Sequence, residues 1–146
     1  MGDGNGKDRR EPTAGRNGLQ MAHVLFVVAL LVAPAIALAR MNLPVGPVWL
    51  VVTLVVVSLV AFLTQWIDKR RAESDAWRVP EKVLHLLELL GGWPGTFVAQ
   101  RLFRHKTSKL SYQAVFWLIV AVHEFVAVDF LLGWKITLHA RQLLGF

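Results

Sequence analysis

The sequence predicts an all-α integral membrane protein with three transmembrane helices and a broken amphipathic or re-entrant helical hairpin on the cytoplasmic side. Hydrophobic residues make up 55% of the 146-residue chain, which is more than soluble domains of this size usually contain. They gather in three blocks of about one bilayer's length. A fourth apolar segment, between the second and third blocks, is interrupted by glycine and proline. The absence of cysteine excludes disulfides and thiolate metal sites.

The amino-terminal part divides into a tail and two spans. Residues 1–19 are rich in Gly, Asn, Asp, Lys and Arg without an apolar period, so they predict a disordered basic tail ahead of a membrane domain at 20–146. Residues 21–39 and 48–66 predict the first two spans. Proline and glycine in the link at 40–47 stop one helix and restart the next, which predicts a tight antiparallel pair.

The first block also has a second reading, as a cleaved signal peptide. Ala37-Leu38-Ala39 follows an apolar run and a basic tail, as at a signal-peptidase site. A retained anchor is favoured because the preceding polar tail is long and a hairpin partner follows. Residues 112–132 predict the third span, which is followed by Gly133-Trp134-Lys135.

Basic residues decide whether residues 80–103 form a further span. If this segment crosses the membrane, about five of the 16 Lys and Arg residues lie outside; if it does not, about three do. The second arrangement agrees better with the excess of basic residues expected on the cytoplasmic side. The sequence therefore predicts a cytoplasmic amino terminus, an external carboxyl terminus and a hairpin that returns to the cytoplasmic face.

The predicted hairpin begins at Pro80, which suits the first turn of a helix. Gly91 and Gly92 are expected to end that helix in left-handed conformations, and Pro94 to open the next one. Together with Gly95 these residues form the predicted structural hinge. Each half is about 15 Å long, so the pair either dips into one leaflet or lies in the interface.

Polar residues on the first half-helix form a stripe of Glu81, His85 and Glu88, spaced i, i+4 and i+7. Carboxylates and an imidazole on one face have the chemistry of a metal or proton site. The favoured interpretation is an ordinary polar face, because one helix supplies at most three ligands and no second cluster is evident. Neither a metal nor a cofactor is predicted.

Basic residues surround the hairpin and predict a site for anionic headgroups or phosphate. Arginine binds phosphate through a bidentate fork, whereas positive-inside topology and diffuse headgroup attraction explain the same charges more simply. The simpler reading is favoured, and both can hold. The members are Lys69, Arg70, Arg78, Arg101, Arg104, His105, Lys106 and Lys109.

Ionisable residues also occur in the third block, where His123 and Glu124 lie near the middle and Asp129 nearer the outer end. A charge at bilayer depth costs at least about 2.5 kcal/mol on insertion scales. One reading is functional, either a proton or cation path or an interface with a partner subunit. The other is a neutral Glu124 hydrogen-bonded to a neighbouring helix, and both readings stay open.

The segment at about 61–120 resembles a family of small bacterial membrane proteins catalogued as domain of unknown function twelve ninety-four, some members of which carry a cold-shock domain. The resemblance rests on Asp68-Lys69, Trp77-Arg78-Val79-Pro80-Glu81, Leu84-His85, Gly91-Gly92-Trp93-Pro94-Gly95, Arg101-Leu102-Phe103-Arg104-His105-Lys106-Thr107, Lys109 and Phe116. It implies a fold and a bacterial cytoplasmic membrane, but no mechanism. A short tail stands where the cold-shock domain would be, so nucleic acid is not the favoured partner.

These observations favour a non-enzymatic scaffold or accessory subunit whose basic hairpin binds anionic lipid headgroups or a partner protein, with a homo-oligomer as a further possibility. One alternative is a membrane enzyme acting on a lipid-linked phosphate, in which Arg78, Arg101 and Arg104 hold charge and His85 or His105 serves as acid or base. Another is a small oligomeric transporter that uses His123 and Glu124.

Overall fold

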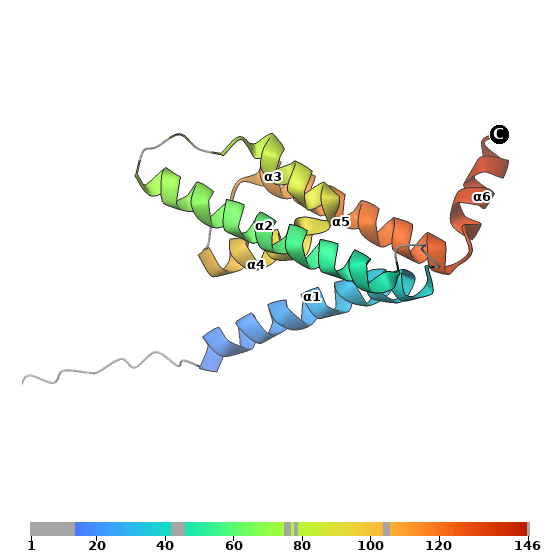
Figure 1. Cartoon of the computed structure of the whole chain (residues 1–146), viewed down its shortest axis with the longest axis horizontal. Coiled ribbons are helices and arrows are strands. Elements are labelled where there is room, and N and C mark those ends of the chain that lie inside the picture. Colours follow the sequence, from blue (N-terminus) through green and yellow to red (C-terminus); the bar gives the residue numbers. More distant parts are fainter. Residues whose placement is uncertain (1–13, 42–45, 75–76, 78, 104–105, 146) are drawn as a thin grey trace, which may run out of the picture.

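The computed structural model describes residues 14–41, 46–74, 77, 79–103 and 106–145, and within them every regular element is a helix. The three longest helices are α1 (Ala14–Arg40), α2 (Pro47–Glu73) and α5 (Leu110–Leu131), which run in alternating directions (Figure 1). The broken hairpin consists of α3 (Glu81–Leu87), the π-helical turn η1 (Glu88–Gly92) and α4 (Trp93–Phe103). A short helix, α6 (Lys135–Leu143), follows α5.

Two of these helices are long and apolar enough to cross a membrane: α2 over Val48–Glu73 and α5 over Leu110–Leu131. The described apolar part of α1, Leu25–Arg40, is shorter. Only 11% of the most apolar stretch of α2 and 22% of that of α5 are buried. A core helix of a soluble protein would bury most of such a stretch, so these helices turn apolar surface outward, as membrane association requires.

The helix α1 starts earlier than the sequence predicted. It begins at Ala14, so residues 14–19 are helical rather than part of a disordered tail. Extending an existing helix adds one hydrogen bond for each residue fixed, which here offsets the low helix propensity of Gly15, Asn17 and Gly18. The remainder of the predicted tail, and residues 42–45 of the predicted link, lie outside the described residues.

The break in the hairpin falls where the sequence placed it. Gly91 has a φ of 100°, a left-handed conformation that residues with a Cβ rarely adopt. The chain reverses there, and α4 runs back toward the end at which α3 began (Figure 1). Ser58 on α2 donates a hydrogen bond of 3.4 Å to the Gly91 carbonyl, which gives the interrupted backbone a partner.

The other hinge glycines have a different function from the predicted one. Gly92 and Gly95 do not have positive φ; they lie where the hairpin contacts α2. A Cβ on Gly92 would lie 2.8 Å from the Ala61 Cβ, and a Cβ on Gly95 would lie 1.9 Å from the Ser58 carbonyl oxygen. The prediction that Gly92 turns the chain was therefore wrong, because small residues are needed here for close helix packing.

The hairpin lies lengthwise beside α2. At its base, the Val79 amide donates to the Asp68 carboxylate at 2.9 Å, and at its tip Gly91 and Gly95 face Leu54 and Ser58. Those positions on α2 are separated by 10 to 14 residues, or about 15–21 Å of helix. The tip therefore passes the middle of α2, so the hairpin lies along this helix and not across its end.

The buried core joins the hairpin to α1 and α5. Its largest members are aromatic, and Phe97 of α4 contacts both Phe116 and Trp117 of α5 with ring centroids 6.4 and 6.2 Å apart. Burial of such rings is a major stabilising contribution. The buried residues of this cluster are Val27, Leu84, Trp93, Phe97, Tyr112, Phe116 and Val120.

Candidate functional site

The basic residues gather at the end of the bundle where α2 stops and the hairpin begins and ends. We call Lys69, Arg70, Arg101, Lys106 and Lys109 the basic end. Lys69 and Arg101 lie over aromatic rings, with their charged groups 5.9 and 5.0 Å from the centroids of Phe103 and Phe97. These cation–π contacts hold the charges beside the hairpin. Arg78, Arg104 and His105, which the sequence assigned to the same site, lie outside the described residues.

Some of this charge is used inside the protein. The Lys106 ammonium lies 2.8 Å from the Asp68 carboxylate, and only 13% of the Lys106 side chain is exposed. Lys109 contacts Glu81 at 2.7 Å, and this hydrogen bond, aided by Lys106, lowers the pKa of Glu81. These contacts tie the segment after α4 to α2 and α3, so Lys106 serves chiefly to close the base of the hairpin.

Arg101 is a cation of the basic end that faces outward. It is exposed, and among the described residues no carboxylate lies within ion-pair distance of it. Lys69 is partly exposed and lies 3.5 Å from Glu73, one helical turn along α2. An exposed pair of this kind contributes little stability, so Lys69 can exchange Glu73 for an external anion at small cost.

A buried polar network lies just inside the basic end. Glu88 is fully buried and accepts a hydrogen bond from the Tyr112 hydroxyl through Oε1, while its Oε2 lies 2.7 Å from His85 Nδ1. Gln65 donates to the same tyrosine oxygen at 2.6 Å. The network joins α2, the hairpin and α5, so it fixes the position of the hairpin between the two candidate spans.

Burial dominates the chemistry of this network. Loss of water raises the pKa of Glu88, although hydrogen bonds from Tyr112 and His85 act in the opposite direction. The His85 ring stacks on Tyr112 with centroids 4.4 Å apart. A carboxyl with a raised pKa beside an imidazole can hold a proton. Protein surrounds this carboxyl, however, because the Glu88 side chain is fully buried.

The predicted polar stripe is therefore divided between two environments. Glu81 belongs to the ion pairs at the base, while His85 and Glu88 belong to the buried network. Among the residues that the structure describes, no three His, Asp or Glu side chains are placed to hold a metal ion. The stripe contacts protein: Lys109, just before α5, pairs with Glu81, and Tyr112 of α5 bonds to Glu88.

The ionisable residues of α5 also differ from one another in their surroundings and roles. His123 Nδ1 donates to the Ile119 carbonyl at 2.8 Å, and Oε1 of Glu124 is buried without a hydrogen-bond partner among the described residues. Asp129 has a different role: it accepts from the amides of Ile136 and Thr137 at 2.9 and 3.2 Å. It thus caps the first turn of α6, which makes it a structural residue.

Two members of the network were missed at the sequence level. Gln65 lies within the second predicted span and Tyr112 at the start of the third, where each was counted as part of an apolar block. The amide of Gln65 and the phenol of Tyr112 within apolar blocks were the signal that the sequence offered, because buried polar groups of this kind require hydrogen-bond partners.

Fold and site together define the class: an all-helical protein with two helices able to cross a membrane and a broken hairpin fixed between them by a buried polar network. The family described as protein of unknown function (DUF1294) matches residues 58–112. An uncharacterized protein of Bacillus subtilis (strain 168), YsdA, is 37% identical over 60 residues, which cover 41% of this chain and 67% of that protein. The chain belongs to this family. No solved structure matches it.

The matched segment coincides with the site. It runs from Ser58, which contacts the hinge, to Tyr112, which closes the buried network. It contains the whole hairpin and the carboxyl-terminal half of α2. The helix α1 and most of α5 lie outside it, so the family segment corresponds to the docked hairpin more than to the complete bundle.

Proposed function

We propose that this chain is a small multi-pass protein of the bacterial cytoplasmic membrane in which α1, α2 and α5 are three spans. The alternating directions of these helices support termini on opposite sides of the membrane (Figure 1). The basic residues gathered at the base of the hairpin favour the cytoplasm for that side and for the amino terminus. In this arrangement the basic end faces the cytoplasm, and the hairpin enters the membrane from that side and returns to it. The link after α1, and α6, lie at the external face.

The function that this geometry supports best is non-enzymatic: a scaffold or accessory subunit whose basic end binds anionic lipid headgroups. The observation that carries this proposal is the outward placement of Arg101 and Lys69 on aromatic rings beside the hairpin. Each basic residue near an anionic surface contributes about 1 kcal/mol of attraction. Lys69 on α2 and Arg101 on α4 are both carried by helices, so ordering them on binding costs less entropy than ordering a flexible tail would.

Native mass spectrometry of the full chain, released from mixed vesicles of phosphatidylglycerol and phosphatidylcholine, tests this proposal. We expect retained phosphatidylglycerol on the wild type and about fivefold less on Arg101→Gln. Arg141→Gln is the matched control, since Arg141 is an exposed arginine on α6, at the opposite end of the bundle from the basic end. Equal retention of the two lipids by the wild type would contradict lipid binding, and a copurifying protein lost on Arg101→Gln would replace lipid with a protein partner.

A further inference from the structure

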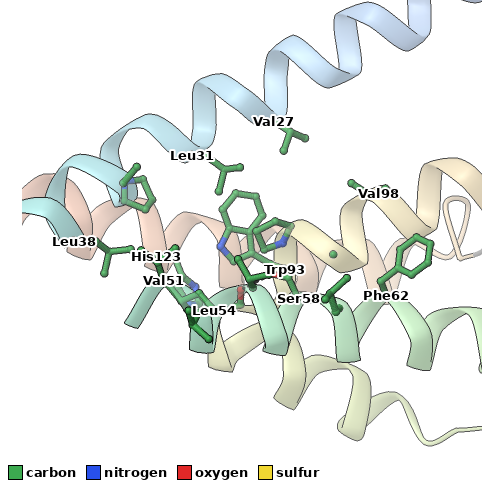
Figure 2. Close-up of a pocket in the computed structure, with 18 of the residues that line it drawn as sticks. Val27, Leu31, Leu38, Val51, Leu54, Ser58, Phe62, Trp93, Val98 and His123 are labelled. Carbon is green, nitrogen blue, oxygen red and sulfur yellow. Dashed lines mark hydrogen bonds between the residues drawn. The ribbon is translucent and has the colours of Figure 1, made fainter. Parts of the chain in front are cut away.

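A large apolar groove runs between α1 and the layer formed by α2 and α4. Its volume is about 1040 Å³, at the upper end of the range for ligand pockets. Val27 and Leu31 point into it from α1, opposite Leu54 and Trp93 (Figure 2). Figure 1 shows why it exists: α1 diverges from α2 with distance from their link, because α1 packs along α5 instead.

The groove has the length and lining of a site for a hydrocarbon chain. Along α2 its lining extends from Val48 to Phe62, or about 21 Å of helix. This exceeds the roughly 15 Å depth of one leaflet's hydrocarbon layer. The polar side chains that line it are Ser58, which is bonded to Gly91, and His123, which is bonded to Ile119. The remaining lining is apolar and suits an acyl chain.

One end of the groove leads to the basic end. Phe62 lines the groove and contacts Phe103 with ring centroids 5.3 Å apart, and Lys69 lies over that second ring. Lys69 is also seven residues after Phe62 and therefore on the same face of α2. On α4, Arg101 follows the groove residue Val98 by three residues. Along their helices, Lys69 thus lies about 10 Å beyond the groove and Arg101 about 5 Å beyond it, on its two walls.

We propose that the groove binds one anionic phospholipid, with an acyl chain along α2 and the phosphate between Lys69 and Arg101. This rests on the proposed lipid-binding function and assigns it a defined site. Charge complementarity selects the occupant: a polar, anionic group at one end and hydrocarbon along the rest match a phospholipid, whereas a transmembrane helix of a partner would place apolar surface against the cations.

Two substitutions on α2 separate this site from general lipid attraction. Val55 lines the groove and Val56 does not, yet both are 52% exposed. Val55→Trp should fill the groove and lower phosphatidylglycerol retention at least fivefold in native mass spectrometry of the full chain. Val56→Trp, the matched control, should retain the lipid as the wild type does. Lys69→Gln with Arg101→Gln should lower retention about 25-fold, or about 1 kcal/mol for each cation.

The outcomes distinguish this inference from the proposed function. If the wild type prefers phosphatidylglycerol but Val55→Trp and Val56→Trp retain it equally, the groove is not the site and lipid binding at the basic end survives. If the wild type shows no preference, both proposals fail. If Val55→Trp instead causes the loss of a second copy of the chain, the groove is a dimer interface and the proposed lipid site is wrong.

Discussion

Substitution of Gly95 by alanine sets two opposite effects against each other. In an isolated helix, Gly→Ala is favourable by about 1 kcal/mol, and Gly95 has ordinary helical backbone angles in α4. Against α2, however, the new Cβ would lie 1.9 Å from the Ser58 carbonyl oxygen. That oxygen belongs to helix backbone, so the contact cannot be relieved by rotating a side chain.

The steric contact with α2 should outweigh the gain in helix propensity. A separation of at least 3.0 Å is needed, so α4 must move away from α2 by about 1 Å along much of the interface. Overpacking of this kind typically costs about 1–3 kcal/mol, and the movement also lengthens the Ser58–Gly91 hydrogen bond, which already measures 3.4 Å. We expect a net loss of about 1–2 kcal/mol after the propensity gain is included.

Thermal unfolding in detergent, followed by size-exclusion chromatography, measures this loss. Gly95→Ala should lower the unfolding temperature, and Gly95→Val should lower it further. Leu102→Ala serves as the control on the same helix, since Leu102 is 66% exposed and its truncation should change stability little. An increase in unfolding temperature for Gly95→Ala, as helix propensity alone predicts, would refute the close contact between α4 and α2.

Three further predictions concern the polar contacts. Tyr112→Phe leaves the buried Glu88 carboxyl without its hydroxyl donor and should cost about 2 kcal/mol of unfolding free energy; a double-mutant cycle with Glu88→Gln that shows no coupling would disprove the network. Asp129→Ala should speed amide hydrogen exchange in α6 by about fivefold, equivalent to a lost cap of about 1 kcal/mol, and unchanged exchange would deny its capping role. Because Lys109 lowers the pKa of Glu81, their pair stabilises the protein above the ordinary glutamate pKa, and this stabilisation is lost as pH falls through the lowered pKa. The stability difference between wild type and Lys109→Met should therefore shrink on acidification, and a difference independent of pH would contradict the pairing.

The hinge could be predicted because its determinants are local. Pro80 and Gly91 act through their own backbone preferences, which a sequence displays directly. The need for glycine at Gly95 is not local, because it depends on the approach of Ser58 from α2. The sequence therefore identified the hinge as a unit but assigned turning to glycines that serve packing.

The roles of the polar residues also depend on contacts that are distant in the sequence. Spacing placed Glu81, His85 and Glu88 on one helical face, but their roles diverge because Glu81 meets Lys109 and Glu88 meets Tyr112. Asp129 was read as an intramembrane charge because α6 was not predicted: nine residues near the chain end give only a short amphipathic pattern. Once α6 is present, its unpaired first-turn amides explain the carboxylate.

Cysteine accessibility tests the central claim most directly, namely that the broken hairpin enters and leaves the membrane on one side. The chain has no cysteine, so Ser108→Cys, Leu90→Cys and Gln142→Cys each supply one site for a membrane-impermeant maleimide. Ser108→Cys should react only from the cytoplasmic side, Gln142→Cys only from the outside, and Leu90→Cys, at the hairpin tip, from neither side until detergent is added. Reaction of Ser108→Cys from the outside alone would show that the hairpin spans the membrane, and would contradict the account.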